Sequence, residues 1–484
     1  MEVSRPHLFN TLSRQVEPFI PLAPEQRDAN GRIPVGMYVC GPTVYDFGHI
    51  GNFRTFVFAD LVRRYLEFRG FAVKHVMNIT DVEDKIIRRI RETGKSLREL
   101  TGHYQAEFLL DLKELGCLPP HHLPRATEHI PQIIDLIRKL EQRSLAYRAS
   151  DGSVYFSIEK YRGCGCRYGQ LVNLNFEAMR AGDRVSSDDY DKESLADFAL
   201  WKARVPEDAD VFWESPWGQG RPGWHIECSA MSMELLGPSF DLHLGGEDLA
   251  FPHHEDEIAQ SEGAGLQPPG SPFVKHWMHA AHLLVEGRKM SKSLGNFLTV
   301  RDLLAKGFAG REIRYLLLSS HYRETFNFTL DGLEGARTAL ARLDECVVKL
   351  TELAAGVSAL PMAEENDLVA AFIEAMDDDL NVSRSWAAVF GWVRDLNRVL
   401  SAGSLSAADA AAALAAWRTL DGVLGVGVKA IEEAPAEIWQ LVEQRQAAKQ
   451  AKDFSRSDAL RQEIKTKGWL VEDTPKGAKL KRVG

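Results

Sequence analysis

VGMYVCGPTVYDFGHIGN (35–52) opens the stretch that decides the fold, and FAVKHVMNIT (71–80) closes it. Residues 35–40 are short and apolar, as in a buried strand, and residues 71–80 have the same character. Between them two apolar rows recur at helical spacing, namely Val57, Leu61 and Tyr65, and Phe58, Val62 and Leu66. Gly70 suits the position just beyond the end of that helix. The order predicts a βαβ unit with parallel strands.

Three chemically active side chains come at or beyond the ends of the two predicted strands. They are Cys40, His49 and Thr80. Open α/β sheets bind ligands at the carboxyl ends of their strands. The turn 49–52 also lies at a helix start, where free N–H groups and the helix dipole attract phosphate. Four residues alone leave the alternative of an ordinary loop histidine open.

A second group of reactive residues lies in RPGWHIECSAM (221–231), DLHLGGED (241–248) and FPHHEDE (251–257). Cys228, His253 and Glu257 offer a thiolate, an imidazole and a carboxylate, all of which bind zinc. Pro252 suits the first turn of a helix, which puts His253 and Glu257 on one face at i and i+4. Cys40 is the candidate for a fourth ligand. The alternative is a buried histidine and glutamate beside an apolar cysteine in an ordinary core.

The loop KMSKSLGN (289–296) follows the strand-like residues 282–285. Lys289 and Lys292 are three residues apart in a Ser- and Gly-rich setting. Such lysines can approach a pyrophosphate leaving group and neutralise the charge that grows in the transition state. The alternative is an exposed basic turn.

Composition and charge exclude several classes of protein. The 484 residues are too many for one core, so three or four domains or inserted units are expected. The net charge of −10 argues against a protein that coats nucleic acid, although residues 441–484 hold 11 Lys and Arg against six Asp and Glu. That basic tail predicts a local polyanion contact, or else a solvated helix.

Six irregularly spaced cysteines form no disulfide framework, and no signal peptide or apolar run of ~20 residues is present. We therefore expect a cytoplasmic protein with no membrane association.

The motifs, in their order along the chain, resemble those of one enzyme family. A His-Ile-Gly-His-like turn after the first strand, combined with a Lys-Met-Ser-Lys-Ser loop, is the mark of class I aminoacyl-tRNA synthetases. The longer strings narrow the resemblance to the cysteinyl-tRNA synthetases: YVCGPTVYDFGHIGN (38–52), NITDVEDKII (78–87), RPGWHIECSAM (221–231), GGEDLAFPHHEDEIAQSE (245–262), KMSKSLGNFLTV (289–300), AMDDDLN (375–381) and KDFSRSDALRQEI (452–464). The resemblance covers nearly the whole chain. It implies ATP-dependent ligation of L-cysteine to tRNA(Cys) through a cysteinyl-adenylate, by a monomer that uses ATP with Mg²⁺ and one zinc ion.

The resemblance also implies a role for each matching residue. The zinc ligands would be Cys40, Cys228, His253 and Glu257. The ATP contacts would be His49, Gly51, Asn52 and Lys292, with Lys289 beside Lys292 in the catalytic loop. The amino-acid and adenylate pocket would be lined by Thr80, Trp224, His243 and Asp248. Asn52 stands where the class signature has a second histidine. Zinc would select cysteine over serine, because it binds a thiolate far better than a neutral hydroxyl.

The expected fold class is α/β. It consists of a class I Rossmann-type catalytic domain with an inserted subdomain, an α-helical bundle and a small C-terminal mixed α/β module. The expected domains are 1–125 and 215–280 (catalytic), 126–214 (connective insertion), 281–325 (stem contact, with the lysine loop), 326–430 (helical bundle) and 431–484 (anticodon binding). Cys164 and Cys166 in the insertion would form an exposed loop, with metal binding or a redox switch as alternatives. Residues 377–379, three successive aspartates, are expected to serve as caps or surface groups.

Two other functions remain open at this point. One is an amine ligase related to the synthetases, which activates cysteine in the same way but has no C-terminal nucleic-acid module. Residues 430–484 count against it. The other is a catalytically silent tRNA-binding paralogue, and the retained His49, Lys289 and Lys292 count against that.

Overall fold

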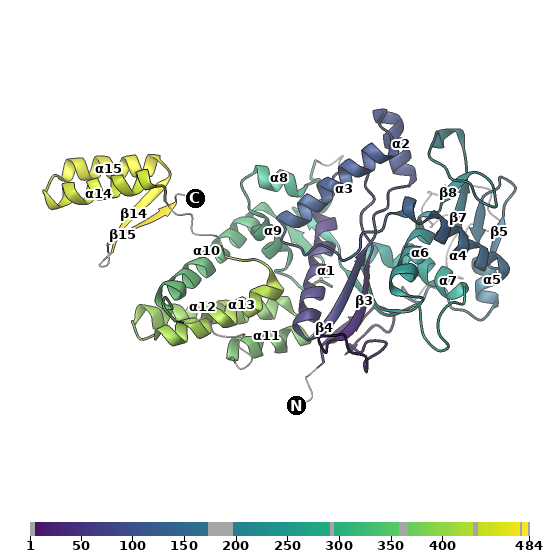
Figure 1. Ribbon diagram of the computed structural model, residues 1–484, viewed down its shortest axis with the longest axis horizontal. Coiled ribbons are helices and arrows are strands. Elements are labelled where there is room, and N and C mark those ends of the chain that lie inside the picture. Colours follow the sequence, from purple (N-terminus) through teal and green to yellow (C-terminus); the bar gives the residue numbers. More distant parts are fainter. Residues whose placement is uncertain are drawn as a thin grey trace. The chain divides into compact units, whose positions relative to one another are not determined.

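A computed structural model describes residues 5–172, 197–290, 295–357, 366–428, 434–474 and 477–482 (Figure 1). The chain divides into two compact units, Met1–Gly427 and Val428–Gly484. No helix in the described ranges is both long enough and apolar enough to cross a membrane.

The larger unit is built on a parallel sheet with the strand order β10-β9-β3-β4. Its strands are β3 (Ile33–Val39), β4 (Phe71–Met77), β9 (Phe240–Gly246) and β10 (Val274–Ala280). The helix α1 (Ile50–Phe68) joins β3 to β4, and both of its predicted apolar rows are buried. Gly70 follows the helix with a φ of 85°, in the left-handed region that glycine adopts without strain. The predicted βαβ unit is confirmed.

The strand order brings distant motifs together at one edge of the sheet. In the register, His243 of β9 lies between Tyr38 of β3 and Trp277 of β10. Cys40 comes directly after β3, and Thr80 comes shortly after β4. The elements that complete this edge are α6 (Trp224–Leu236), the π-helical turn η5 (Ala250–His254) and α7 (Glu255–Gly263).

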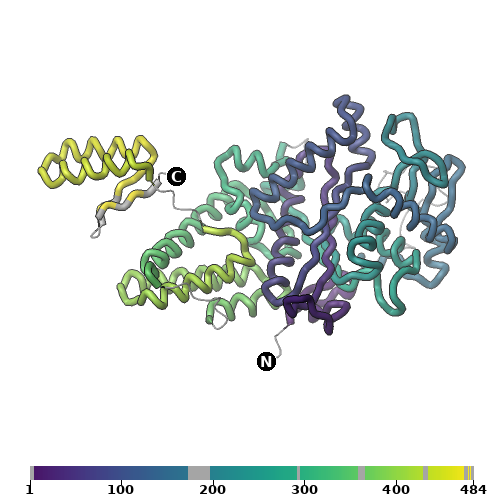
Figure 2. Tube along the Cα trace, viewed as in Figure 1, coloured from purple at the N-terminus to yellow at the C-terminus, as the bar shows by residue number. Residues whose placement is uncertain are grey.

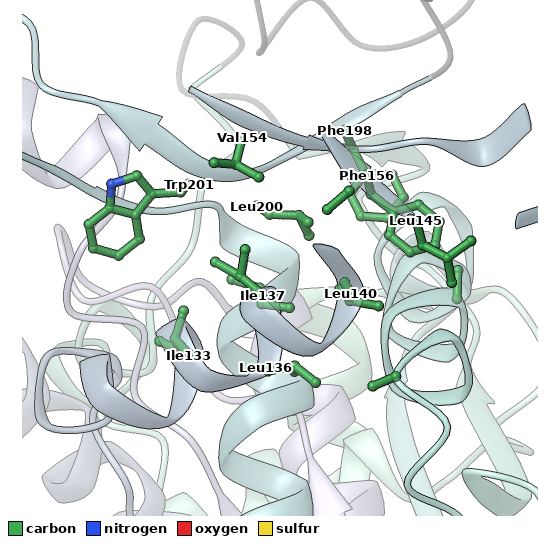
Figure 3. Packing of buried hydrophobic residues seen from close by; sticks show 14 of the residues in the cluster. Ile133, Leu136, Ile137, Leu140, Leu145, Val154, Phe156, Phe198, Leu200 and Trp201 are labelled. Carbon is green, nitrogen blue, oxygen red and sulfur yellow. The ribbon is translucent and has the colours of Figure 1, made fainter. Parts of the chain in front are cut away.

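The predicted insertion, together with residues 220–222 beyond its expected end at 214, forms an antiparallel sheet in the order β5-β6-β7-β8, covered by α4 (Ile130–Gln142). Its elements are β5 (Ala146–Arg148), β6 (Val154–Phe156), α5 (Ile158–Gly163), β7 (Phe198–Ala203) and β8 (Gly220–Pro222). Figure 3 shows Ile137 and Leu140 of α4 beside Leu200 of β7, within one apolar cluster. The insertion therefore has a core of its own, and β8 leads directly into α6 of the active-site edge.

The helices after the lysine loop complete the larger unit. Figure 2 shows α10 (Leu330–Leu353) and α13 (Ala407–Leu424) running side by side, and α11 (Asp367–Asp377) packs on α12 (Val382–Ser401). The remaining elements of this unit are β1 (His7–Asn10), β2 (Gln15–Pro18), α2 (Asp84–Thr93), α3 (Leu97–Glu114), η1 (Ala126–Glu128), η3 (Pro206–Asp208), η4 (Glu247–Leu249), β11 (Leu283–Val285), β12 (Arg288–Lys289), α8 (Val300–Ala305), α9 (Gly310–Leu317) and β13 (Phe326–Phe328).

The aspartates at 377–379 correct a prediction. Asp377 and Asp379 are buried rather than at the surface. Asp377 accepts hydrogen bonds from Tyr65 and Arg69 at the end of α1, and Asp379 pairs with Arg323. Only Asp378 has the predicted capping position, at the end of α11. The contacts of Asp377 with Tyr65 and Arg69 attach the helical bundle to the sheet domain, between residues more than 300 positions apart that no local pattern connects.

The smaller unit consists of α14 (Ala436–Gln450), α15 (Phe454–Thr466), β14 (Trp469–Thr474) and β15 (Gly477–Arg482). The two helices pack on each other, and the two strands form an antiparallel hairpin. Trp469 is buried in the apolar core of this unit, whereas Phe454 is 63% exposed.

Candidate active site

Two thiols, an imidazole and a carboxylate meet beyond the carboxyl ends of β3 and β9. Sγ of Cys40 lies 4.0 Å from Sγ of Cys228 and 3.6 Å from Oε1 of Glu257. Nε2 of His253 lies 3.1 Å from the same Oε1, one helical turn away. All four side chains are buried, and their donor atoms lie within 4.8 Å of one another. We call Cys40, Cys228, His253 and Glu257 the donor cluster.

Burial and mutual contact set the charges of the donor cluster. Burial alone would raise the pKa of Glu257, but the nearby His243 and His253 lower it. Burial would also lower the pKa of His253, and the Glu257 carboxylate overrides this effect and raises it. A hydrogen bond from Cys40 lowers the pKa of the Cys228 thiol, whereas burial raises the pKa of Cys40. The cluster therefore combines an anionic carboxylate and a readily ionised thiol, which suits a bound cation.

Further histidines surround the donor cluster and were missed by the sequence analysis. Nδ1 of His225 lies 2.8 Å from Nδ1 of His253, and Nε2 of His254 lies 3.3 Å from Sγ of Cys40. Nδ1 of His254 in turn lies 2.8 Å from Nε2 of His279. The pair His253-His254 was a visible signal for one of them. His279 gave none, because only the pairing of β10 with β9 brings it to this edge.

His243 lies behind the donor cluster. Its ring is fully buried, and Nε2 lies 3.0 Å from Oε2 of Glu257. The ring stacks on Trp277, with the centroids 4.5 Å apart. His243 therefore holds the second oxygen of the Glu257 carboxylate.

The other three residues expected in the substrate pocket differ in exposure. Trp224 is 37% exposed, and its ring stacks on His253 with the centroids 4.2 Å apart. Thr80 is buried, and its Oγ1 accepts a hydrogen bond from Asn78 at 3.2 Å. Asp248 is exposed. Trp224 thus gives the donor cluster a wall that faces solvent.

The turn 49–52 caps α1. Nδ1 of His49 accepts the Asn52 N–H at 3.2 Å, and Oδ1 of Asn52 accepts the His49 N–H at 3.1 Å. Burial lowers the pKa of His49, so the ring is neutral at pH 7. Because Nδ1 accepts, the ring proton lies on Nε2. Nε2 of His49 and the Nδ2 amide of Asn52 are therefore the groups that can donate to a phosphate.

The described ends of the lysine loop both contact this turn. A Cβ at Gly51 would lie 2.7 Å from Cε of Met290, so the loop end packs on the bare glycine backbone. On the other side the ring of Phe297 packs edge-on against His49, and the Ile50 N–H donates to the Leu298 carbonyl at 2.8 Å. Lys289 is exposed. Lys292 lies outside the described residues.

Known protein families match the chain over most of its length. The family model for the class I (C) tRNA synthetase catalytic domain matches residues 27–338, and the model for the DALR domain matches residues 371–429. The cysteine--tRNA ligase of Chlamydia pneumoniae is 46% identical over 480 residues, which cover 98% of each chain. That of Chlamydia muridarum is 45% identical over 496 residues, which cover 98% of this chain and 99% of the relative.

Solved structures resemble the chain in fold. The methionyl-tRNA synthetase of Mycobacterium tuberculosis, in complex with methionyl-adenylate, aligns with a TM-score of 0.58 at 15% identity, over 81% of this chain and 89% of that one. A ternary LeuRS–tRNA–LeuAMS complex from Agrobacterium radiobacter K84 aligns with a TM-score of 0.60 at 12% identity, over 83% and 85%. At these identities the likeness concerns the fold, and it agrees with the parallel sheet and the helices that follow it.

Proposed function

The chain belongs to the cysteine--tRNA ligase family of class I synthetases, and on that basis we propose that it joins L-cysteine to tRNA(Cys). The reaction consumes ATP, passes through a cysteinyl-adenylate, and releases AMP and diphosphate. The observation that carries the proposal is the position of the donor cluster beside the turn 49–52, at one edge of one sheet. A thiol-recognising group and a phosphate-binding helix start are the two parts that activation of cysteine requires.

Zinc is the metal that the donor cluster fits best. Two sulfurs, one nitrogen and one oxygen are the mixed ligands that zinc accepts, and donors of a tetrahedral zinc site lie about 3.3–3.8 Å apart. The 3.6 and 3.1 Å contacts of Glu257 and the 4.0 Å contact of the two sulfurs are close to that spacing. When bound, zinc would favour a thiolate substrate over a hydroxyl.

A second set of donors, Cys40, His243, His254 and Glu257, also lies within 4.8 Å. We favour the donor cluster for two reasons. His243 and His254 are fully buried, whereas His253 of the donor cluster packs on the partly exposed Trp224. In addition, two thiolates suit zinc better than one. His243 and His254 then act as supports of Glu257 and Cys40.

The phosphates of ATP, with Mg²⁺, are assigned to the start of α1. Nε2 of His49 and the amide of Asn52 are available as donors, and the helix dipole adds positive potential there. Because Gly51 has no side chain, Met290 of the lysine loop can pack against the first turn of α1. Lys289 and Lys292 would neutralise charge on the departing diphosphate, which is where a fixed cation lowers the barrier most.

The amino-acid and adenylate pocket is assigned to Thr80, Trp224, His243 and Asp248. Serine differs from cysteine only by oxygen for sulfur, and an apolar wall separates such near-isosteres poorly. Selection therefore falls to the donor cluster, with Trp224 as the wall beside it. A cytoplasmic monomer that acts on tRNA(Cys), L-cysteine and ATP completes the proposal.

ATP–pyrophosphate exchange, tested with each amino acid in turn, examines this function directly. Exchange that depends on cysteine alone excludes a silent tRNA-binding paralogue. Subsequent charging of tRNA(Cys) excludes an amine ligase. Exchange driven by another amino acid would overturn the proposal.

The zinc assignment predicts the effect of Cys228→Ser. The variant is expected to lose bound zinc and cysteine-dependent exchange together, because a hydroxyl replaces a thiolate ligand. Metal content is measured by elemental analysis, and circular dichroism checks the fold. The matched control is Cys346→Ser, a buried cysteine on α10 remote from the donor cluster. Full zinc content in Cys228→Ser would contradict the assignment.

A further inference from the structure

A groove of about 310 Å³ lies between α2 and the loop that joins β3 to α1. We call it the cationic groove, and its lining residues are Tyr45, Asp46, Lys85, Arg88, Arg89 and Glu92. Backbone hydrogen bonds join the loop to the segment between β4 and α2, including one from Val44 N–H to the Thr80 carbonyl at 3.1 Å. The loop wall continues directly into His49. The groove therefore lies beside the candidate active site, at the same edge of the sheet.

The α2 wall of the groove carries an excess of positive charge. Its four residues recur at i, i+3, i+4 and i+7, so they share one face of the helix, while Ile86 and Ile87 are buried on the other. Arg89 pairs with Glu92 at 3.2 Å, which neutralises both. Lys85 and Arg88 are exposed, and neither forms an ion pair with a carboxylate among the residues that the structure describes. In a chain with a net charge of −10, two such cations beside the site indicate a polyanionic ligand.

The loop wall adds an aromatic ring. Tyr45 is half-buried, and Nζ of Lys85 lies 5.9 Å from the centroid of its ring. Proteins hold single-stranded nucleic acid by this combination, since cations follow the phosphates while a base stacks on the ring. The volume of the groove suits a unit of nucleotide size.

We propose that the cationic groove binds the single-stranded 3′ end of the tRNA. Lys85 and Arg88 contact its phosphates, and Tyr45 stacks on a base. The inference rests on the proposed function, because a terminal hydroxyl of the tRNA has to reach the adenylate beside the donor cluster. ATP is the other anion of the reaction, but its phosphates are assigned to the start of α1, whose capping residues His49 and Asn52 do not line the groove.

The test is the double substitution Lys85→Gln with Arg88→Gln, measured in two reactions. Cysteine-dependent ATP–pyrophosphate exchange without tRNA is expected to keep its rate and its KM for ATP. In the charging reaction, the KM for tRNA is expected to rise about tenfold at about 0.15 M salt, because two phosphate contacts are lost. The slope of log KM against log salt should fall by about 1.4 for the same reason.

Two comparisons isolate the groove from general charge effects. Arg91→Gln with Lys95→Gln removes the same charge from exposed positions outside the groove, and it should leave the KM for tRNA nearly unchanged. Tyr45→Leu should lower kcat/KM for tRNA about fivefold or more, whereas Tyr45→Phe keeps the stacking ring and should not.

The possible outcomes separate this inference from the proposed function. A raised KM for ATP in exchange, with an unchanged KM for tRNA, would show that the groove holds the nucleotide and overturn the inference. Equal effects of the groove and control substitutions would also overturn it. Wild-type protein without cysteine-dependent exchange would instead refute the proposed function. A direct tRNA-binding titration of the same variants would then test whether the cationic groove binds tRNA.

Discussion

Glu257 is held by two histidines through different oxygens. His253 contacts Oε1 at 3.1 Å, and His243 contacts Oε2 at 3.0 Å. Only His253 belongs to the donor cluster, and His243 is enclosed between Glu257 and Trp277. A side chain in that position orients a ligand without contacting the metal itself. The pocket role that the resemblance implied for His243 stays a prediction, and the support of Glu257 is a second role that can be tested.

His243→Ala is expected to weaken zinc binding by about 10- to 100-fold, because Glu257 loses the donor that fixes Oε2. Competition with a chelator measures the affinity in the absence of substrates. His276→Ala serves as the matched control, since His276 is also buried in a strand of the same sheet but contacts no member of the donor cluster in the described structure. An unchanged zinc affinity in His243→Ala would rule out the supporting role.

At the scale of elements, α8 is attached to α3 through Arg301. Its guanidinium lies 3.2 Å from Oδ1 of Asp111, also pairs with Glu107, and covers the ring of Phe47 at 4.9 Å. Asp111 is buried, and burial raises its pKa to about 6 although Arg301 opposes the shift. The first helix after the lysine loop is thus joined to α3 by a carboxylate that is costly to ionise.

The raised pKa of Asp111 predicts a pH-dependent effect of Asp111→Asn. A carboxyl whose folded pKa is raised from 3.8 to about 6 stabilises the fold fully below 3.8, and that contribution is lost as the pH rises through 6. The variant should therefore be more stable than wild type at pH 7, by about 3 kcal/mol at most. The difference should vanish near pH 4. Thermal unfolding midpoints at several pH values measure it.

Asp395→Asn provides the control for this measurement. Asp395 is an exposed residue of α12, so its substitution should shift the unfolding midpoint little at any pH. A difference between Asp111→Asn and wild type that stays constant from pH 4 to 7 would contradict the linkage argument.

At the scale of the molecule, the chain divides after Gly427 into two units, each with its own apolar core. The donor cluster, the turn 49–52 and the lysine loop all belong to the larger unit. A chain that ends at Gly427 should therefore retain cysteine-dependent ATP–pyrophosphate exchange. Charging of tRNA(Cys), and the preference for the cysteine anticodon, should both fall sharply. Measurement of exchange and charging on the same preparation tests this division of labour.

Substitution of Phe454 tests anticodon recognition in the full-length chain. Its ring is 63% exposed, so Phe454→Ala should weaken anticodon discrimination if the ring stacks on a base, without loss of stability. Trp469→Ala is the contrasting variant, because Trp469 is buried and its loss should unfold the smaller unit. A truncated chain that keeps its anticodon preference would mean that recognition lies in the larger unit.

The sequence by itself determined the local structure and the identity of the reactive residues. Apolar spacing from Val35 to Thr80 is enough to predict strand, helix and strand, because the periods of 2 and 3.6 residues are properties of the backbone. The i, i+4 spacing likewise put His253 and Glu257 on one helical face. Motif resemblance then supplied the family, which the full-length relatives confirm.

Only the tertiary structure decided which distant residues meet. Cys40 and Cys228 are 188 positions apart, and they meet because α6, which carries Cys228, packs against β3. The same strand order puts His243 behind Glu257, and the docking of the bundle buries Asp377. Periodicity cannot reveal such contacts, because it describes how each element presents its own side chains. Which elements become neighbours depends on the packing of their apolar faces over the whole chain.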